Sequence, residues 1–456
     1  MFQRFFDEGL AQASFLIACD RTKRAVVIDP RRDASIYMAA AAQGGTTIVA
    51  SIETHVHADF LSGARELAAK GAEIYAGPGS DLEFPHHAVS DGERLTIGDL
   101  TIEFLHTPGH TPEHICVLAR QPNEPARLFT GDLLFVGAVG RPDLLGADVT
   151  RRLASDLFDS LQRVMALGDD VEVHPGHGAG SLCGAGIGHE PSTTIARERR
   201  QNALLQHRDR DAFVTAVLGD LPETPSYFAR MKEINRLGPD VLGLADASPR
   251  VPSIKPAAAA ALAADGAVVV DLRPAAAFAG GHPYGAINLG FGPKVGYWAG
   301  WVIAPDSPVI LLADEPGHAQ DAAVQLLRVG LDRVDGSIAG GFDAWVGAGL
   351  PVASLEQISA SDLSARLSAH AVRVIDVRSP REFQAGHIEG SVNVPVGDVP
   401  ARAHQLAMNG VIATICEGGY RSTLAASLLA REGGAHVMNV IGGMTAYRAE
   451  AKERSE

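Results

Sequence analysis

The second half of the chain contains an internal repeat, and this feature constrains the fold more than any other. Residues 268–273 match residues 373–378, and Asn288 matches Asn393 at the same offset of 105 positions. Several identities at one constant offset indicate a duplicated domain. Each copy begins with a short apolar run typical of a buried strand, followed by a second apolar strand and a helix. This pattern predicts two small α/β domains, each with a parallel sheet.

The rest of the chain is long enough for one further domain. A chain of 456 residues holds roughly three domains of ~150 residues each. Strand-like and helix-like segments alternate through the first half, and the Pro-rich residues 247–252 are typical of a linker. We therefore expect domains at residues 1–246, 253–353 and 356–456.

Composition and charge argue against several classes of protein. The net charge of −15 is unfavourable for a nucleic-acid partner, because phosphate backbones select basic surfaces. No apolar run reaches the ~18 residues of a membrane span, and Arg4, Asp7 and Glu8 interrupt any secretory signal. The cysteines are widely scattered, which suits free thiols in a reducing compartment. We expect a cytoplasmic homo-oligomer with neither a membrane nor a nucleic-acid partner.

The first domain carries a set of candidate metal ligands, each shortly after a predicted strand. Residues 54–59 read Thr-His-Val-His-Ala-Asp, and His110, Asp132 and His177 lie in three later turns. Loops at strand ends are where open sheets place chemistry. We predict that His55, His110 and Asp132 bind the metal. Two imidazoles and one carboxylate with open positions suit non-haem Fe(II) acting with O₂, whereas zinc would use the same residue types to activate water.

Three more side chains are alternatives for a second metal, or partners that orient the ligands. His57, Asp59 and His177 have suitable donor atoms. His106 and His114, which flank His110, are expected to be structural or peripheral. Phe60 follows Asp59 directly, and a phenyl ring cannot donate electrons to a metal. One corner of any two-metal site therefore lacks a ligand.

This domain resembles the metallo-β-lactamase superfamily and, within it, the persulfide dioxygenase branch. The motifs that carry the resemblance are residues 54–59 continuing into 61–63, and residues 131–135 continuing into 140–143. The resemblance implies an αββα sandwich and one iron(II) per chain, held by His55, His110 and Asp132, with zinc as the alternative. It also implies oxidation of a thiol persulfide by O₂ to sulfite. Phe60 departs from the glutathione-type members, which have a histidine there, so glutathione, coenzyme A and similar thiols all remain candidates.

Two further residues are candidates for contact with the substrate. Arg141 could bind an anionic group, because guanidinium offers carboxylates a fork of donors; a salt bridge within the protein is the alternative. Cys183 follows the His177 turn closely and could take up sulfur near the metal. The alternative for this residue is an inert buried thiol.

The second repeat copy contains a cysteine loop between a strand and a helix. Cys416 is followed by Glu417, Gly418, Gly419, Tyr420 and Arg421, and we expect the helix from Ser422 onward. Backbone N–H groups and the helix dipole favour an anionic sulfur at such a position. The two glycines let the loop curl so that its amides point inward.

This copy resembles the rhodanese family. Residues 376–378, residues 386–391 and the loop from Cys416 to Arg421 carry the resemblance. It implies sulfur transfer with Cys416 as the carrier and Arg421 as a second catalytic residue, and the loop residues between them would bind the substrate. Related phosphatases have a loop one residue longer, so the loop length favours sulfur over phosphate.

The first repeat copy lacks the cysteine. Asp314 occupies the position of Cys416, and Gln320 that of Ser422. A carboxylate cannot carry a persulfide. We therefore expect a rhodanese-like domain without catalytic activity, which serves as a spacer.

These features lead to one hypothesis with two alternatives. The leading hypothesis is a persulfide dioxygenase fused to a sulfurtransferase, with O₂, sulfite and thiosulfate as the other reactants or products. The first alternative is a zinc hydrolase of the glyoxalase II type that acts on thioesters, which would need a second metal. The second is a sulfur carrier that forms a persulfide on Cys416 but does not consume O₂.

Overall fold

The computed structural model describes residues 1–219, 221–408 and 410–453. The chain divides into two compact units. The first consists of Met1–Ser248 with Leu327–Gly330, and the second of Pro249–Leu326 with Leu331–Glu456. The main division, between Ser248 and Pro249, falls inside the predicted linker. Both copies of the repeat belong to the second unit, apart from Leu327–Gly330 of the first copy, which group with the first unit.

The first unit is built on two six-stranded sheets. The first sheet contains β1 (Phe2–Asp7), β2 (Gln12–Cys19), β3 (Arg24–Ile28), β4 (Thr47–Glu53), β5 (Glu73–Ala76) and β6 (His87–Ala88), in that order. The second contains, in spatial order, β12 (Thr193–Thr194), β11 (Glu172–Pro175), β10 (Arg127–Gly131), β9 (Ile115–Arg120), β8 (Leu100–His106) and β7 (Arg94–Ile97). Each sheet mixes parallel and antiparallel pairs.

Every residue of β2 is buried because both faces of its sheet are covered. Successive side chains of a strand point to opposite faces. Phe15 and Ile17 accordingly pack into the core between the two sheets, together with Phe104 and Phe129 of the second sheet. Leu16, between them, packs with α1 on the opposite face.

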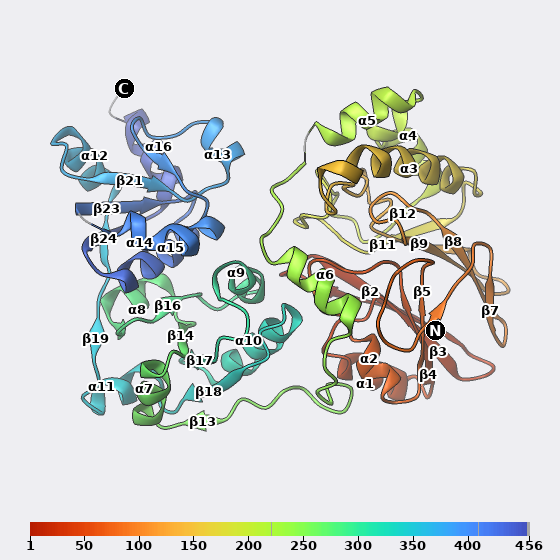
Figure 1. The fold of residues 1–456 in the computed structure, drawn as a ribbon, viewed down its shortest axis with the longest axis horizontal. Coiled ribbons are helices and arrows are strands. Elements are labelled where there is room, and N and C mark those ends of the chain that lie inside the picture. The colour runs from red at the N-terminus through yellow and green to blue at the C-terminus, as the bar shows by residue number, and fades with distance from the viewer. Residues whose placement is uncertain (220, 409, 454–456) are drawn as a thin grey trace. The chain divides into compact units, whose positions relative to one another are not determined.

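Helices cover the outer faces of both sheets. The helices of this unit are α1 (Ser35–Gln43), α2 (Ala64–Ala68), α3 (Ala147–Met165), α4 (Ile195–Gln201), α5 (Arg210–Leu218) and α6 (Phe228–Leu237), with a 3₁₀ turn η1 (Leu204–Gln206). Figure 1 shows α1 and α2 on one side of the paired sheets and α3, α4 and α5 on the other. Leu157 and Leu161 of α3 pack on the second sheet, and Tyr37 of α1 packs on the first. The predicted αββα sandwich is confirmed.

The second unit contains two five-stranded parallel sheets with the same topology. The first copy has the order β13 (Ser253–Ile254), β18 (Val334–Ile338), β17 (Val309–Leu312), β14 (Val268–Asp271) and β16 (Ile287–Asn288). The second has the order β20 (Glu356–Ile358), β24 (Ala435–Val440), β23 (Gly410–Ile415), β21 (Arg373–Asp376) and β22 (Val392–Asn393). A short antiparallel pair joins β15 (His282–Pro283) to β19 (Val352–Ala353). The equivalent strand orders confirm the duplication inferred from the sequence.

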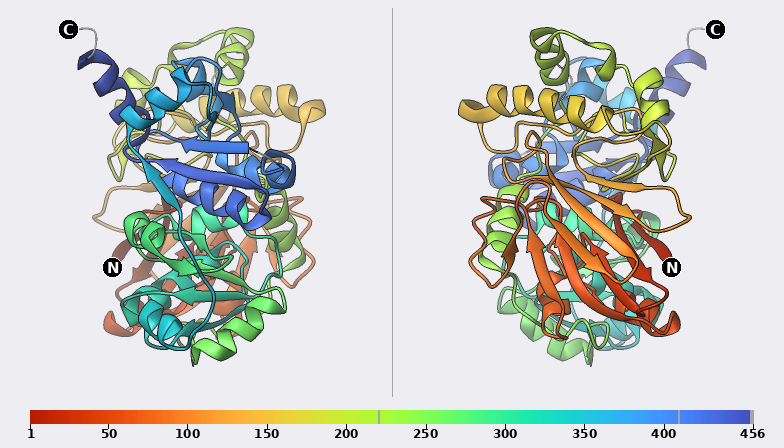
Figure 2. Two further views of the ribbon diagram at one scale, coloured as in Figure 1. Left: turned by 90° about the vertical axis from the view of Figure 1, so that its left-hand side faces the viewer. Right: turned by 90° about the vertical axis from the view of Figure 1, so that its right-hand side faces the viewer.

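Helices flank the sheet of each copy (Figure 2). The first copy has α7 (Pro256–Ala264), α8 (Ala275–Gly280), α9 (Val295–Val302), α10 (Pro316–Arg328) and α11 (Gly341–Gly347). The second copy has α12 (Ala360–Ser368), α13 (Pro380–Gln384), η2 (Val396–Asp398), α14 (Val399–Leu406), α15 (Tyr420–Glu432) and α16 (Gly443–Glu453). Within the described ranges, no helix has both the length and the apolar composition that crossing a bilayer requires.

The repeated asparagine fastens the same turn in both copies. Asn288 Nδ2 donates to the carbonyl oxygens of Asp271 (3.1 Å) and Arg273 (2.9 Å). Asn393 Nδ2 makes the equivalent bonds to Asp376 and Arg378. The identity between the copies therefore reflects a structural requirement of the fold.

We predict that Asn288→Ala lowers the free energy of unfolding by about 1–3 kcal/mol, because two carbonyl groups lose their partner in a buried turn. Asn393→Ala should have a smaller effect, since Asn393 is less buried than Asn288. Urea denaturation of the full chain measures both. The exposed amide variant Gln384→Ala is the control, and equal stability of Asn288→Ala and wild type would contradict the prediction.

Candidate functional site

The three predicted metal ligands converge from loops that follow three strands. His55 lies after β4, His110 after β8 and Asp132 after β10. All three side chains are buried, and their ligand atoms lie within 4.8 Å of one another. The expectation that loops at strand ends bring these residues together agrees with this arrangement.

Both histidines present an unprotonated Nε2 to the common centre. His110 Nδ1 donates to the carbonyl oxygen of Arg141 at 2.7 Å. Thr54 Oγ1 donates its proton to Asp29 Oδ2 (2.9 Å), so it accepts a hydrogen bond from His55 Nδ1 (2.9 Å). Burial lowers the pKa of both imidazoles. Each neutral ring therefore keeps its Nε2 lone pair for a metal, as oriented histidine ligands do.

The carboxylate of Asp132 divides its two oxygens between a protein partner and the centre. Oδ1 accepts a hydrogen bond from His177 Nδ1 at 2.7 Å. Oδ2 lies 3.8 Å from His55 Nε2 and 3.5 Å from His110 Nε2. His55 Nε2 and Asp132 Oδ2 are buried without a hydrogen-bond partner among the described residues. Atoms about 2.1 Å from one shared ion are roughly 3–3.6 Å apart, so these residues fit a metal.

His114, expected from the sequence to be structural or peripheral, helps to hold Asp132 in place, and sequence reasoning missed Thr107 and Gly131. The backbone N–H of Asp132 donates to His114 Nε2 at 3.2 Å, and His114 Nδ1 lies 3.0 Å from Thr107 Oγ1. Burial lowers the pKa of His114 to about 3, so this ring is neutral. Gly131 has a φ of +46°, and a Cβ there would lie 2.5 Å from Thr54 Oγ1. In the sequence, the glycine directly before Asp132 was the available signal of this close packing.

His57 lies outside the ligand set. Its Nε2 is 3.2 Å from Asp29 Oδ1 and 3.3 Å from Glu53 Oε2. Burial alone would lower the pKa of His57, but the two carboxylates raise it well above the usual value. An imidazolium between two buried carboxylates is an internal ion network. The same three residues have ligand atoms within 4.8 Å of one another, and the alternative in which His57 binds a second metal stays a prediction.

Asp59, His177 and Cys183 form a second buried cluster, with ligand atoms within 4.8 Å of one another. His177 donates from Nδ1 to Asp132 and from Nε2 to Asp59 Oδ2 (2.9 Å). These carboxylates outweigh the effect of burial and raise the pKa of His177 to about 10. Both nitrogens of the ring thus carry protons. Burial, followed by the charges of Asp132 and Asp59, raises the pKa of the Cys183 thiol well above its usual value.

Phe60 packs an apolar ring against His57. Its side chain is fully buried, and its ring centroid lies 4.4 Å from that of His57. No atom of this side chain can bind a metal. The corner that the sequence left without a ligand is therefore packed rather than open.

The Arg141 guanidinium is used within the protein. It pairs with Asp143 through two bonds (2.7 and 2.8 Å) and also donates to Leu182 O and Thr224 Oγ1. Of the two alternatives, this geometry favours the internal salt bridge. The role of Arg141 as a substrate anchor stays a prediction. The observed contact of Arg141 with the site is through its backbone carbonyl, which accepts the hydrogen bond from His110.

We predict that Thr54→Val weakens metal binding by about 10–100-fold, because it removes the acceptor that orients His55. The measurement is competition for Co(II) between the protein and a chelator. Thr46→Val is the matched control, since the Thr46 hydroxyl is buried and donates only to Ala41 O. An affinity equal to that of wild type would contradict the proposed role of Thr54.

In the second unit, Cys416 lies at the end of β23 with donors directed at its sulfur. The thiol is buried, and Sγ accepts from the Gly419 backbone N–H (3.1 Å) and from Ser422 Oγ (3.4 Å). Gly419 adopts a left-handed φ of +105°, which turns the chain into α15. The helix begins at Tyr420, two residues before the start expected from the sequence, because this glycine ends the loop.

The start of α16 holds the other side of the cysteine loop. The backbone N–H groups of Met444 and Thr445 donate to the carbonyl oxygens of Cys416 (2.8 Å) and Glu417 (3.1 Å). A Cβ at Gly443 would lie 2.2 Å from the Cys416 oxygen. Gly443 therefore permits this close contact, which gives both loop carbonyl oxygens a hydrogen-bond partner.

The remaining loop side chains are paired with neighbours. Arg421 forms a two-bond ion pair with Glu382, with both distances 2.7 Å. Glu417 contacts Arg378 (3.3 Å) and Arg448 (2.7 Å). Tyr420 is partly exposed. The predicted catalytic role of Arg421 and substrate-binding roles of Glu417, Gly418, Gly419 and Tyr420 stay predictions.

The Glu382–Arg421 pair should make stability depend on pH. Burial opposes ionisation, but Arg421 lowers the pKa of Glu382 to about 2. Its contribution is complete above the unfolded value of about 4.3 and is lost as pH falls towards 2. The difference in unfolding free energy between wild type and Glu382→Gln should therefore shrink from pH 6 to pH 3. Urea titrations measure this, with exposed Glu389→Gln as the control; a difference independent of pH would contradict the prediction.

The first copy places a carboxylate where the second has its sulfur. Asp314 follows β17, and its side chain is exposed. Gln320 donates to Pro249 O. This position therefore offers a carboxylate rather than a thiol, and the role of the first copy as an inactive spacer stays a prediction.

Comparisons with known proteins agree with this architecture. The profile of the metallo-beta-lactamase superfamily matches residues 7–177, and that of the rhodanese-like domain matches residues 255–348 and 359–450. Hydroxyacylglutathione hydrolase of Francisella tularensis subsp. holarctica is 33% identical over 175 residues, which are 38% of this chain and 65% of that protein. The enzyme of that name from Xanthomonas oryzae pv. oryzae is 30% identical over 50% of this chain and 85% of its own length.

A solved structure extends the similarity to most of the chain. A metallo-beta-lactamase from Staphylococcus aureus subsp. aureus COL is 33% identical with a TM-score of 0.66, covering 74% of this chain and 98% of that one. The chain belongs to the metallo-beta-lactamase superfamily through its first unit, and two rhodanese-like domains follow.

Proposed function

We propose that the chain is a persulfide dioxygenase joined to a sulfurtransferase, with one iron(II) bound by His55, His110 and Asp132. The observation that carries the proposal is the number of available ligands. The remaining candidate imidazoles, His57 and His177, are held by carboxylates. This leaves two histidines and one carboxylate, a set typical of iron sites that use O₂.

Bound iron(II) would supply neighbouring open positions for the persulfide sulfur and for O₂. The protein contributes orientation and enclosure. Thr54 and the Arg141 carbonyl fix the two imidazole rings, and His177 holds Asp132 through Oδ1. Burial of the three ligands keeps bulk water away from the reacting sulfur.

The proposed reaction balances as RSSH + O₂ + H₂O → RSH + SO₃²⁻ + 2H⁺. The outer sulfur of the persulfide is oxidised and dioxygen is reduced, while the thiol leaves unchanged. At Cys416, transfer of the outer sulfur from RSSH would give a Cys416 persulfide and RSH. Attack of sulfite on the outer sulfur of that persulfide would release thiosulfate and restore the Cys416 thiol.

The Cys416 loop supports this second step. Gly419 N–H and Ser422 Oγ donate to the sulfur, and donors of this kind stabilise a thiolate or persulfide anion. Two activities on one chain raise the effective concentration of a shared intermediate. The second step could also run in reverse and use thiosulfate.

A zinc-dependent thioester hydrolase is the second candidate function. It is favoured by the relatives named hydroxyacylglutathione hydrolase and by the cluster of Asp59, His177 and Cys183. Loss of protons from His177 and Cys183 would allow that cluster to bind a second ion. Phe60 and the two hydrogen bonds made by His177 count against it.

The test is O₂ uptake by anaerobically purified, iron-loaded protein supplied with glutathione or coenzyme A persulfide. We expect one iron per chain, and sulfite formed with one O₂ consumed per persulfide. His55→Gln should abolish uptake, because it removes a ligand. Cys416→Ser should keep uptake but lose thiosulfate formation.

Three outcomes would redirect the assignment. Two zinc ions per chain with hydrolysis of S-lactoylglutathione would favour the hydrolase. Labelling of Cys416 as a persulfide without O₂ uptake would favour a sulfur carrier. Uptake by the His55→Gln variant at the wild-type rate would show that the metal site is not responsible.

A further inference from the structure

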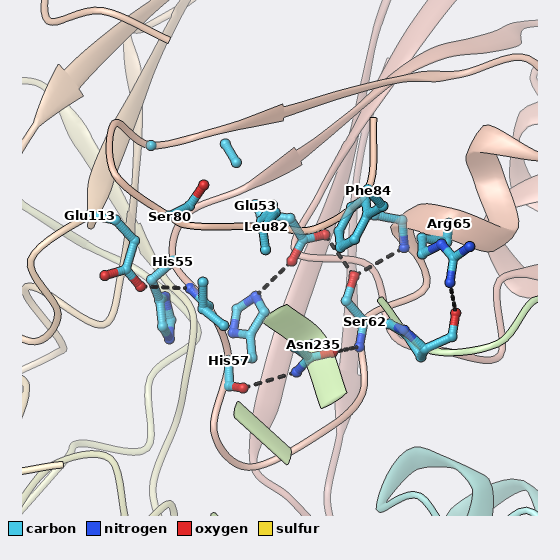
Figure 3. Close-up of a pocket in the computed structure, with 15 residues that line it drawn as sticks. Glu53, His55, His57, Ser62, Arg65, Ser80, Leu82, Phe84, Glu113 and Asn235 are labelled. Carbon is cyan, nitrogen blue, oxygen red and sulfur yellow. Dashed lines mark hydrogen bonds and ion pairs between the residues drawn. The ribbon is translucent and has the colours of Figure 1, made fainter. Parts of the chain in front are cut away.

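Helix α6 is fastened directly to the metal-binding turn by one asparagine. Asn235 Nδ2 donates to the carbonyl oxygens of His57 (2.9 Å) and Phe60 (2.7 Å), and its Oδ1 accepts from the Ser62 N–H (2.9 Å). Figure 3 shows Asn235 between His57 and Ser62, within hydrogen-bonding reach of both. The side chain is buried. These three bonds fix one face of α6 against the loop that carries His55.

Lys232 lies on this same face of α6. It precedes Asn235 by three residues, and residues three apart on a helix are neighbours. Burial is the main cause that lowers the pKa of His110, and the positive charge of Lys232 is a smaller cause in the same direction. Glu113, which accepts from the Val56 N–H in the same turn (3.0 Å), attracts the Lys232 ammonium. Lys232 therefore lies on the face of α6 that Asn235 holds against the metal-binding turn.

The Lys232 ammonium has no hydrogen-bond partner among the residues that the structure describes. Its Nζ is buried and makes no hydrogen bond to any described residue. A buried charge without a partner is costly, so buried lysines are normally paired. By contrast, the more exposed Arg236 on the same helix pairs with Glu233 and Glu83. Burial lowers the pKa of Lys232, as expected for a desolvated ammonium.

The missing partner should be an anion that arrives with the substrate. Lysine is a compact point charge, which suits a single anionic group without fixed orientation. A divalent ion with two neutral imidazoles and one carboxylate leaves the centre with a formal charge of about +1. Lys232 raises that to about +2, which favours anionic sulfur species.

We propose that Lys232 is the anion-binding residue of the metal site and pairs with a negatively charged group of the bound substrate. The identity of that substrate as a thiol persulfide rests on the proposed function. The anionic group is either the persulfide sulfur itself or a carboxylate or phosphate on the body of the thiol. Ion pairing through Nζ is common to both.

Binding to the Co(II)-loaded full chain tests the proposal without turnover. Sulfite and glutathione are titrated while the visible absorption of Co(II) is followed. Lys232→Met should raise the apparent dissociation constant of at least one of these anions by about tenfold or more. Lys232→Arg, which keeps the charge, should stay within about threefold of wild type. Arg236→Met removes an exposed, paired cation from the same helix and should bind as wild type does.

Thermal melting of the metal-free protein separates this role from a structural one. Lys232→Met removes an unpaired buried charge and should raise the melting temperature of the first unit, by about 2–4 °C. A lysine that held the fold together would give a lower melting temperature instead. Lys232→Met that melts lower and binds both anions like wild type would overturn the proposal. Failure of the wild-type protein to bind either anion would overturn it as well.

Turnover with two persulfides identifies the anionic group. Glutathione persulfide carries carboxylates, whereas the persulfide of 2-mercaptoethanol has an uncharged body. A raised KM of Lys232→Met for both indicates pairing with the persulfide sulfur, and a raised KM for glutathione persulfide alone indicates pairing with the thiol body. If wild type takes up no O₂ but Lys232→Met still weakens anion binding, the dioxygenase proposal fails and the role of Lys232 stands. If wild type takes up O₂ but Lys232→Met binds both anions as wild type does, the proposal for Lys232 fails and the dioxygenase proposal stands.

Discussion

The geometry of the metal site depends on the carboxylate of Asp29. This side chain, at the end of β3, accepts from the backbone N–H and the hydroxyl of Thr54 and lies beside His57 Nε2. One buried carboxylate thereby orients His55 through Thr54 and draws His57 away from the ligand set. An uncompensated charge is costly in a buried site. Removing any one of these partners would therefore leave a buried charged or polar group unpaired.

The pairing of buried polar groups also determines how many side chains stay available to bind a metal. Asp132 gives one oxygen to His177 and keeps the other for the metal, and His177 uses its second nitrogen for Asp59. The hydrogen bonds that organise one metal position thus occupy the groups that could form another. Phe60 completes the effect by filling the adjacent space with an apolar ring. The side chains that could bind a second ion are thus engaged with one another in this structure.

In the duplicated domains, the residues that stabilise the fold are shared by both copies, whereas the cysteine is found in the second copy alone. Both copies keep the Asp–Arg pair and the asparagine that fastens it, because the sheet and its first turn require them. Only the second has a sulfur at the end of its central strand, with donors from the loop and with the loop carbonyls held by α16. The fold of the first copy does not depend on a nucleophile. Asp314 can therefore stand at the cysteine position without disturbing the fold.

Much of this protein could be predicted from its sequence, because local rules were sufficient. The repeat offset determined the two α/β domains, and the strand-then-turn positions of His55, His110 and Asp132 were enough to nominate the ligands. Sequence could not decide between roles for His57, His177 and Arg141, since the partners that occupy them, Asp29, Asp59 and Asp143, compete with metal or substrate only after folding. Nor could it single out Lys232, whose relevance arises from the contact that Asn235 makes with a turn far away in the sequence. The residue types determined which chemistry was available; the tertiary structure alone decided which donors were already satisfied and which were left for a ligand.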